Sequence, residues 1–249
     1  MTATRPLCAS DAAADASVIR RRAARDGYVF FRSLLPRDRV DAMCDHVLSV
    51  ADDLGWLDAD APPGSALSVA GVRLGAYDDP RWIAFLQRVL PHPSFAAVRG
   101  APAVLAVLAA IFDAPPESDA GDLCRVVSSD DPAHTTVAHQ DQFYLPGSTP
   151  RWSMWVPLDR CPLGLGPLAV LPGSHTRGLL PHTGDVAWRR AVAVASDTGW
   201  AASDLEPGDA IFFSSLTVHR ALPNTSGRRL RLSLTCRYRA AGLPATAQP

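Results

Sequence analysis

Residues 136–142 read Thr136-Val-Ala-His139-Gln-Asp141-Gln142, and the interpretation of the fold starts from this run. We expect it to form a β-strand. Because side chains along a strand alternate between its two faces, His139 and Asp141 would point the same way and Gln140 the other way. His219, on a further expected strand, would add a third ligand. Two imidazoles and one carboxylate on one side of an octahedral ion leave the other side open, which is a donor set suited to Fe(II).

The composition excludes several classes of protein. The chain has 249 residues, of which 47% are hydrophobic, enough for a substantial core. A formal net charge of −1 does not indicate a nucleic-acid-binding surface. All 24 cationic residues are arginine, so neither a Schiff-base lysine nor the lysine of a phosphate-binding loop is present. The sequence indicates no particular oligomeric state.

Cysteine usage and targeting signals bear on location. The cysteines are widely spaced and form no C-x-x-C pair, which predicts neither a disulfide framework nor a thiolate zinc site; they are Cys8, Cys44, Cys124, Cys161 and Cys236. Residues 1–15 lack the basic start and apolar centre of a secretory signal. No apolar run is long enough to span a bilayer. We therefore expect a cytoplasmic protein without a membrane partner.

The hydrophobic periodicity and the turn residues divide the chain into a helical part and a β part. Helices are expected at 11–26, 36–54, 80–90 and 102–112, with Gly27 and Gly55 as C-terminal caps and a short strand at 28–31 between the first two. After residue 113 the pattern changes to short apolar runs separated by Pro and Gly. The expected strands are 123–128, 136–142, 152–158, 168–171, 210–214 and 230–238.

This order of elements predicts an α+β fold. A helical N-terminal part, about residues 10–112, would pack on a β core of sandwich or jelly-roll type, about residues 120–240. The chain shows no repeats, no low-complexity tail and no linker. We therefore expect one domain that spans residues 1–249.

Four segments of the β part occur in an order that resembles the phytanoyl-CoA dioxygenase family of Fe(II)/2-oxoglutarate-dependent oxygenases. They are His139-Gln-Asp141; Trp155-Val-Pro-Leu-Asp159 with Gly166-Pro-Leu-Ala-Val-Leu-Pro-Gly-Ser-His175; Gly208-Asp-Ala-Ile-Phe-Phe213 running to His219; and Asn224-Thr-Ser226 with Arg229, Arg231, Ser233 and Tyr238. The resemblance covers roughly residues 120–240. It implies a double-stranded β-helix, of the jelly-roll or cupin-like kind, as the core.

The resemblance also implies the cofactors and the residues that bind them. His139, Asp141 and His219 would hold Fe(II), and 2-oxoglutarate and O2 would be the co-substrates. The family anchors the far carboxylate of 2-oxoglutarate with an arginine, whose fork matches a carboxylate. Arg231 is the first choice and Arg229 the second.

Three further arginines and the other histidines are expected to lie as follows. Arg125 would contact either 2-oxoglutarate or a substrate carboxylate, with a surface position as the alternative. Arg228 and Arg237 are expected to face solvent. Of the remaining histidines, His175 is expected to be structural, and the others are expected at the surface or in turns; these are His46, His92, His134 and His182.

The candidates for substrate contact follow the H-x-D triplet or lie on the next strand. Gln142, Phe143 and Tyr144 would line the mouth of the pocket. Trp152 is a fourth candidate, and Trp155, three residues further, would point to the opposite face of its strand. For each aromatic residue, packing in the core is the alternative explanation.

The presence of Asp141 narrows the expected reaction. In related halogenating enzymes a small residue replaces this carboxylate, so the resemblance implies hydroxylation of a C–H bond in a small organic molecule, with release of succinate and CO2. A specialised metabolite is the preferred substrate. Desaturation, cyclisation or epimerisation would use the same cofactors. A metal-dependent β-barrel protein without redox chemistry, or a non-catalytic binding protein, is the alternative of another class.

The sequence also contains a pattern that we reject. Residues Gly164-Leu-Gly166-Pro-Leu-Ala169 match the glycine-rich fingerprint of dinucleotide-binding proteins. That fingerprint needs a helix directly after the glycines, because the helix N-terminus binds the pyrophosphate. Here a strand-like Ala-Val-Leu and a Pro-Gly turn follow, so we expect no nucleotide site.

Overall fold

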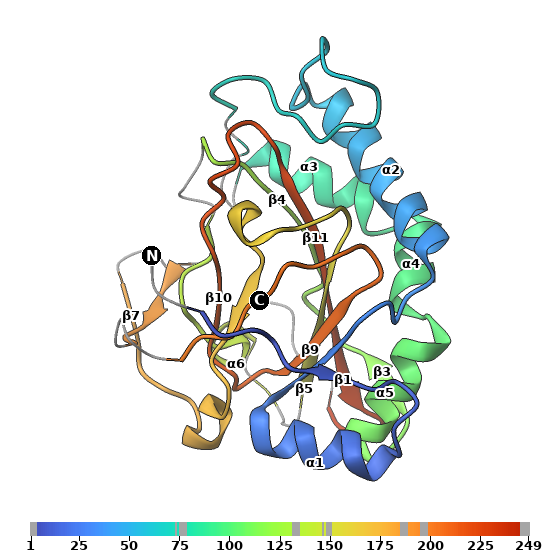
Figure 1. Ribbon diagram of the computed structural model, residues 1–249, viewed down its shortest axis with the longest axis vertical. Coiled ribbons are helices and arrows are strands. Elements are labelled where there is room, and N and C mark those ends of the chain that lie inside the picture. The colour runs from blue at the N-terminus through green and yellow to red at the C-terminus, as the bar shows by residue number, and fades with distance from the viewer. Residues whose placement is uncertain are drawn as a thin grey trace.

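The structure is a computed structural model that describes residues 4–72, 74, 79–130, 135–145, 147, 151–184, 189–194 and 199–244. Five helices come first in the chain: α1 (Ala16–Asp26), α2 (Arg37–Asp53), α3 (Pro80–Val89), α4 (Pro93–Arg99) and α5 (Pro102–Phe112) (Figure 1). Among the described helices, none is by itself long and apolar enough to cross a membrane, although α4 and α5, bent relative to each other, pass that test as a pair.

The helix boundaries follow from local signals. α1 ends where Gly27 adopts a left-handed conformation (φ 73°) and its N–H bonds to the carbonyl of Ala23. α3 begins after Asp79, whose carboxylate accepts the N–H of Arg81, with proline in the first turn. The expected helices 36–54, 80–90 and 102–112 are confirmed within one residue, whereas α1 starts five residues later than expected. α4 was not expected.

Most strands form one large sheet. Its order is β1 (Ala9–Ser10), β2 (Tyr28–Phe31), β9 (Ala210–Ser214), β5 (Arg151–Pro157), β11 (Arg231–Ala240) and β3 (Pro116–Ser118), and β4 (Leu123–Val127) also pairs with β11. All of these pairs are antiparallel except β1 with β2. Two small sheets pair β10 (His219–Ala221) with β6 (Leu168–Val170) and β7 (His182–Thr183) with β8 (Ala191–Val192).

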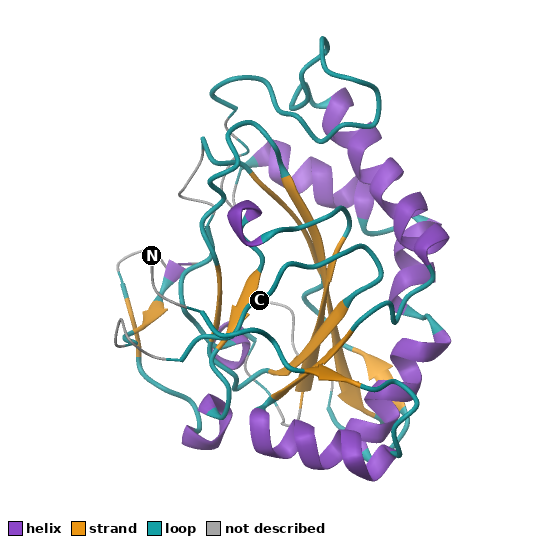
Figure 2. Cartoon of the chain, in the orientation of Figure 1, coloured by secondary structure: helices purple, strands orange, loops and turns teal. Residues whose placement is uncertain are grey.

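The two faces of the large sheet have different partners. Helices α2 to α5 cover one face, and the β10–β6 sheet lies on the other side (Figure 2). The side chains of β5 divide accordingly: Trp152, Met154 and Val156 join the core under the helices, while Trp155 joins the core that contains Leu168 and Val170. The opposite orientation of Trp152 and Trp155 is therefore confirmed. The chain combines helices with a large mixed sheet, as the sequence predicted.

The expected strand at 136–142 is wrong, because none of these residues belongs to a strand of two or more residues. His139 forms an isolated bridge with His219, in which each N–H bonds to the other carbonyl at 2.9 and 3.0 Å. Asp141 instead begins the short helix α6 (Asp141–Tyr144). Tertiary hydrogen bonds decide this turn, because the Gln142 N–H bonds to the Ser215 carbonyl at 3.0 Å. Gln140 points away from the two ligands as expected, and its amide nitrogen donates to the carbonyls of Gly178 and Leu216.

Candidate metal centre

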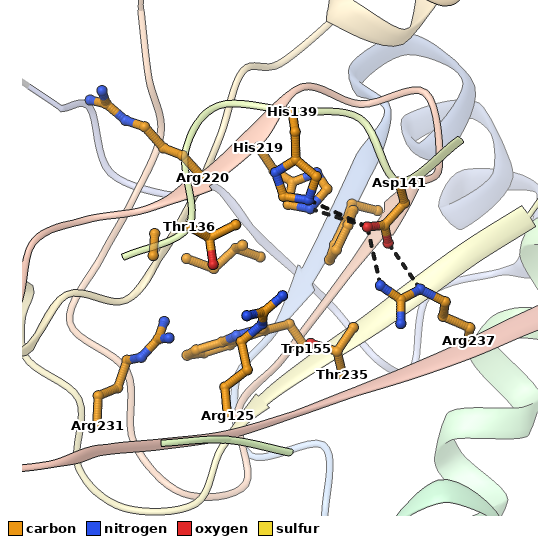
Figure 3. A pocket seen from close by; sticks show the side chains of 13 residues that line it. Arg125, Thr136, His139, Asp141, Trp155, His219, Arg220, Arg231, Thr235 and Arg237 are labelled. Atoms are coloured by element: carbon orange, nitrogen blue, oxygen red, sulfur yellow. Dashed lines mark hydrogen bonds and ion pairs between the residues drawn. The ribbon is translucent and has the colours of Figure 1, made fainter. Parts of the chain in front are cut away.

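Three residues that could hold a metal ion meet between the large sheet and the β10–β6 sheet. One side-chain ligand atom of each of His139, Asp141 and His219 lies within 4.8 Å of the others, and all three residues are buried. The Nε2 atoms of His139 and His219 lie 3.5 and 3.7 Å from Oδ1 of Asp141 (Figure 3). The bridge between residues 139 and 219 brings the two imidazoles together, and α6 brings the carboxylate to them.

Hydrogen bonds fix which nitrogen of each ring is available. Nδ1 of His139 bonds to the Val137 carbonyl at 2.9 Å, and Nδ1 of His219 bonds to the Thr217 carbonyl at 3.0 Å. A carbonyl only accepts, so Nδ1 carries the proton in both rings and Nε2 keeps its lone pair for a ligand. Burial, followed by the neighbouring His139, lowers the pKa of His219 to about 3. His219 is therefore a neutral ligand at physiological pH.

The Asp141 carboxylate is held by two donors from neighbouring strands. Ser153 Oγ donates to Oδ2 at 2.7 Å. The guanidinium of Arg237 donates from Nε to Oδ2 at 3.2 Å and from Nη2 to Oδ1 at 3.1 Å. Burial alone would raise the pKa of the carboxyl, but the charge of the neighbouring Arg237 keeps that pKa well below its usual value. The carboxylate is ionised.

The expectation that Arg237 faces solvent is wrong. Its side chain is 12% exposed and lies beside the triad, while Arg228, which was expected at the surface, is half exposed and pairs with Asp58. The alternation of β11 explains the position of Arg237. Every second residue of β11, namely Leu232, Leu234 and Cys236, belongs to the core under the helices. The residues between and beside them therefore share the opposite face of the strand; they are Arg231, Ser233, Thr235 and Arg237.

A pocket adjoins the triad, and the face of β11 just described forms one of its walls. Its empty volume is about 370 Å³, which includes part of the open mouth. Arg125 and Arg231 point into it, and Arg220 points away from the triad (Figure 3). The other lining residues include Thr136, Trp155, Leu168, Phe213, Thr235 and Arg237. The pocket is therefore rich in arginine.

The two candidate anchors of a carboxylate have different surroundings. Arg231 is 1% exposed, lines the pocket, and donates from Nη1 to the Gly166 carbonyl at 3.1 Å. Arg229 is not among the residues that line this pocket, and its Nη2 pairs with Asp159 at 2.6 Å. Arg125 pairs in register with Ser233, so its side chain stands beside the pocket face of β11.

The residues expected to contact substrate lie around the pocket without lining it. Gln142 accepts a hydrogen bond from Ser215 at 2.9 Å, the Phe143 ring stacks on His182 at 4.1 Å, and the Tyr144 hydroxyl donates to the Arg190 carbonyl at 2.6 Å. Trp152 is buried in the core under the helices. The sequence analysis did not identify Thr136, Thr235 or Phe213 as pocket residues. Alternation along β11 and β9 could have placed Thr235 and Phe213 on the side of the pocket.

The remaining histidines have structural contacts. His175 Nε2 bonds to the Ala24 carbonyl, and His92 accepts the Ser94 N–H at the start of α4. His46 stacks on His92 with ring centroids 3.6 Å apart. His182 Nε2 accepts the N–H of Gln140 at 3.0 Å, next to two ligands of the triad. His134 lies outside the described residues.

The comparison with known families agrees with the donor set. Residues 23–232 match the phytanoyl-CoA dioxygenase (PhyH) family. The chain belongs to this family. A relative from Streptomyces arenae, 1-deoxypentalenic acid 11-beta-hydroxylase, is 26% identical over 230 residues, which are 86% of this chain and 78% of the relative.

Solved structures show the same fold. The epimerase SnoN, in complex with Fe3+, alpha ketoglutarate and nogalamycin RO, aligns with a TM-score of 0.65 at 22% identity and covers 91% of this chain and 84% of its own. The carbocyclase SnoK from nogalamycin biosynthesis aligns with a TM-score of 0.63 at 20% identity, with coverages of 94% and 87%.

The triad fits the metal that the phytanoyl-CoA dioxygenase family uses. Two neutral imidazoles with free Nε2 lone pairs and one ionised carboxylate are hard and borderline donors that suit Fe(II). The adjoining pocket offers an arginine for a dicarboxylate co-substrate. As a member of the phytanoyl-CoA dioxygenase family, the chain is an oxidoreductase that depends on Fe(II), 2-oxoglutarate and O2.

Proposed function

We propose that this phytanoyl-CoA dioxygenase family member hydroxylates a C–H bond of a small specialised metabolite. The observation that carries the proposal is the triad of His139, Asp141 and His219 at the end of a pocket that also contains Arg231. The relative from Streptomyces arenae, which is 26% identical over 86% of this chain, is a hydroxylase of 1-deoxypentalenic acid. The presence of Asp141 supports hydroxylation over halogenation, since no vacant ligand position is left for a halide.

The residues of the site would divide the work as follows. His139, Asp141 and His219 would hold Fe(II), and Arg231 would pair with the far carboxylate of 2-oxoglutarate. Arg231 is preferred over Arg229 because Arg231 lines the pocket and Arg229 does not. Arg125 would be a second cation for the co-substrate. Bound Fe(II) would enable dioxygen to oxidise both 2-oxoglutarate, which would leave as succinate and CO2, and a C–H bond of the substrate.

A different reaction with the same cofactors is the second candidate function. An epimerase and a carbocyclase share this fold, so desaturation, cyclisation and epimerisation are the alternatives to hydroxylation. The pocket walls would decide between them by the position in which they hold the substrate. Gln142, Phe143 and Tyr144 remain candidates for substrate contact from α6, which follows the ligand Asp141 directly.

We also propose three features of the whole chain. The large sheet and the β10–β6 sheet would be the two halves of a double-stranded β-helix, supported by the core that they share at Trp155, Leu168 and Phe213. Residues 1–249 would form one domain, supported by a hydrophobic core common to the helices and the sheet. A cytoplasmic location is supported by the five cysteines, which are all free thiols.

The product of turnover tests the proposed reaction. The protein with Fe(II), 2-oxoglutarate and O2 would be supplied with 1-deoxypentalenic acid and related small acids, and succinate and product masses would be recorded. We expect succinate and a product that has gained one oxygen atom, and neither with Asp141→Ala. A product that has lost two hydrogens, or has the mass of the substrate with inverted configuration, would replace hydroxylation by the second candidate.

A further inference from the structure

The two oxygens of the Asp141 carboxylate share one partner, Arg237, and otherwise face different groups. Oδ1 faces both imidazoles, at 3.5 Å from Nε2 of His139 and 3.7 Å from Nε2 of His219. Oδ2 receives two hydrogen bonds, from Ser153 Oγ at 2.7 Å and from Nε of Arg237 at 3.2 Å. The second oxygen is therefore occupied by protein donors on the side of the large sheet.

We propose that Arg237 and Ser153 are positioning residues that hold Oδ2 and leave Oδ1 as the single oxygen of Asp141 that binds the metal. This proposal rests on the proposed function for the identity of the metal. A carboxylate can bind a cation through one oxygen or through both. If Asp141 bound through one oxygen, the triad would cover only one face of an octahedral ion and leave the opposite face for 2-oxoglutarate and dioxygen. Binding through both oxygens would take one of those positions.

The sheet places the two donors as a pair. Ser153 on β5 and Arg237 on β11 are direct partners in the antiparallel register, so their side chains stand on the same face of the sheet. The backbone of Arg237 is fixed as well, because its N–H bonds to Asp122 Oδ1 at 2.8 Å and its carbonyl accepts the N–H of Asp119 at 2.8 Å. The pair is therefore a rigid support for the carboxylate.

The planar guanidinium suits this role better than an ammonium group would. Arg237 contacts both carboxylate oxygens from one fork, with Nε on Oδ2 and Nη2 on Oδ1, and so fixes the plane of the carboxylate. A lysine would supply the charge without that plane. We therefore expect Arg237→Lys to retain part of the metal affinity that Arg237→Gln loses.

The direction in which metal affinity changes when Arg237 is removed distinguishes a positioning role from a purely electrostatic one. A cation beside a metal site repels the metal ion, so if Arg237 acted only through its charge, its removal would tighten metal binding. If Arg237 positions the ligand, its removal weakens metal binding, as is typical for partners that orient metal ligands, by about 10- to 100-fold. The two explanations predict changes of opposite direction.

The experiment measures the dissociation constant of Mn(II) for the metal-free full-length protein, without 2-oxoglutarate or substrate. The variants are Arg237→Gln, Arg237→Lys and Ser153→Ala. Arg239→Gln is the matched control, because Arg239 lies two residues along the same face of β11 and pairs with Glu117 instead of the triad. Circular dichroism and thermal melting confirm that each protein is folded, and Ser153→Ala provides the test if Arg237→Gln does not fold.

We expect Mn(II) affinity to fall about tenfold or more in Arg237→Gln and in Ser153→Ala, less in Arg237→Lys, and not in Arg239→Gln. Unchanged or tighter binding by folded Arg237→Gln, or by Ser153→Ala if only that variant folds, would overturn the proposal. An equal loss in Arg239→Gln would also overturn it, because the effect would then be general. Since neither 2-oxoglutarate nor substrate takes part, a failure of the proposed reaction would leave this result unaffected.

Discussion

At the scale of single residues, the environment of each arginine decides its role. Arg231 is almost fully buried in the pocket wall, where it donates to the Gly166 carbonyl and lies 6.0 Å from the centre of the Trp155 ring. Arg229, two residues earlier, reaches Asp159 and is about one-third exposed. A buried cation beside a pocket is available to an anionic ligand that excludes water from it.

The first prediction separates these two arginines. Arg231→Gln removes a charge-assisted contact worth about 1.5–3 kcal/mol, so the affinity for 2-oxoglutarate should fall roughly 10- to 100-fold. Arg229→Gln breaks only a partly exposed ion pair and should leave that affinity nearly unchanged. Titration of the iron-loaded protein with 2-oxoglutarate under anaerobic conditions measures both. The opposite ranking would move the anchor to Arg229.

The sequence predicted that His139, Asp141 and His219 come together, but it did not predict that Arg237 lies beside them. The residue types at 139, 141 and 219 define the donor chemistry, and the order of the surrounding segments identified the family. Arg237 was assigned to solvent although it lies three alternations from Arg231, on the same face of β11. Alternation could have placed it on the pocket side, but its contact with Asp141 depends on α6, which only the tertiary structure reveals.

At the scale of elements, the turn before β6 contacts Arg231, the proposed anchor of 2-oxoglutarate. Gly166 has a left-handed conformation (φ 79°), and its carbonyl accepts a hydrogen bond from Arg231. An added Cβ at this position would collide with the backbone carbonyl of Leu222. Gly166, which belongs to the pattern that resembles a nucleotide fingerprint, therefore allows two backbone segments to pass close to each other beside the pocket.

The second prediction concerns this turn. Gly166→Ala should destabilise the protein by roughly 1–3 kcal/mol, from left-handed strain and the backbone collision, and should weaken 2-oxoglutarate binding because the Arg231 contact shifts. Gly164→Ala is the control, since its added Cβ would meet only Thr225 Oγ1 at an ordinary 3.6 Å. Thermal melting and 2-oxoglutarate titration report the two effects. Equal behaviour of the two variants would contradict this account of the turn.

Long elements were predictable and short ones were not. α2, α3 and α5 carry proline or aspartate starts and regular apolar spacing over ten or more residues. α4 follows α3 after only three residues, and its seven residues are too few to show a clear helical period, although His92-Pro93 marks its start. In α6, four residues are too few for any periodicity, and contacts with Ser215 override the strand pattern.

At the scale of the whole molecule, burial of the metal site links stability to pH. The pKa of His219 is about 3 in the folded protein because burial disfavours the charged ring, compared with about 6.5 in an unfolded chain. Below about pH 6.5, His219 therefore binds a proton in the unfolded chain but stays neutral in the folded protein. The free energy of unfolding consequently decreases as the pH falls from about 6.5 to about 3. The lowered pKa of His182 acts in the same direction.

The third prediction follows from this linkage. The metal-free protein should lose stability as the pH falls from 7 to 5, and His219→Gln should reduce that loss, because an amide has no proton to gain in this range. Urea unfolding of both proteins at several pH values gives the slopes. A metal-free protein whose unfolding midpoint stays constant between pH 7 and pH 5 would contradict the buried, neutral state of His219.

The central claim is that the triad and Arg231 together form one site for Fe(II) and 2-oxoglutarate. The most direct test adds both to the metal-free protein without oxygen and records the visible charge-transfer band of 2-oxoglutarate chelated to iron. We predict that the band appears with the unaltered protein, is absent with His219→Ala, and requires more 2-oxoglutarate with Arg231→Gln. A folded, iron-loaded protein without the band would contradict the claim and favour a metal-binding protein without this redox chemistry.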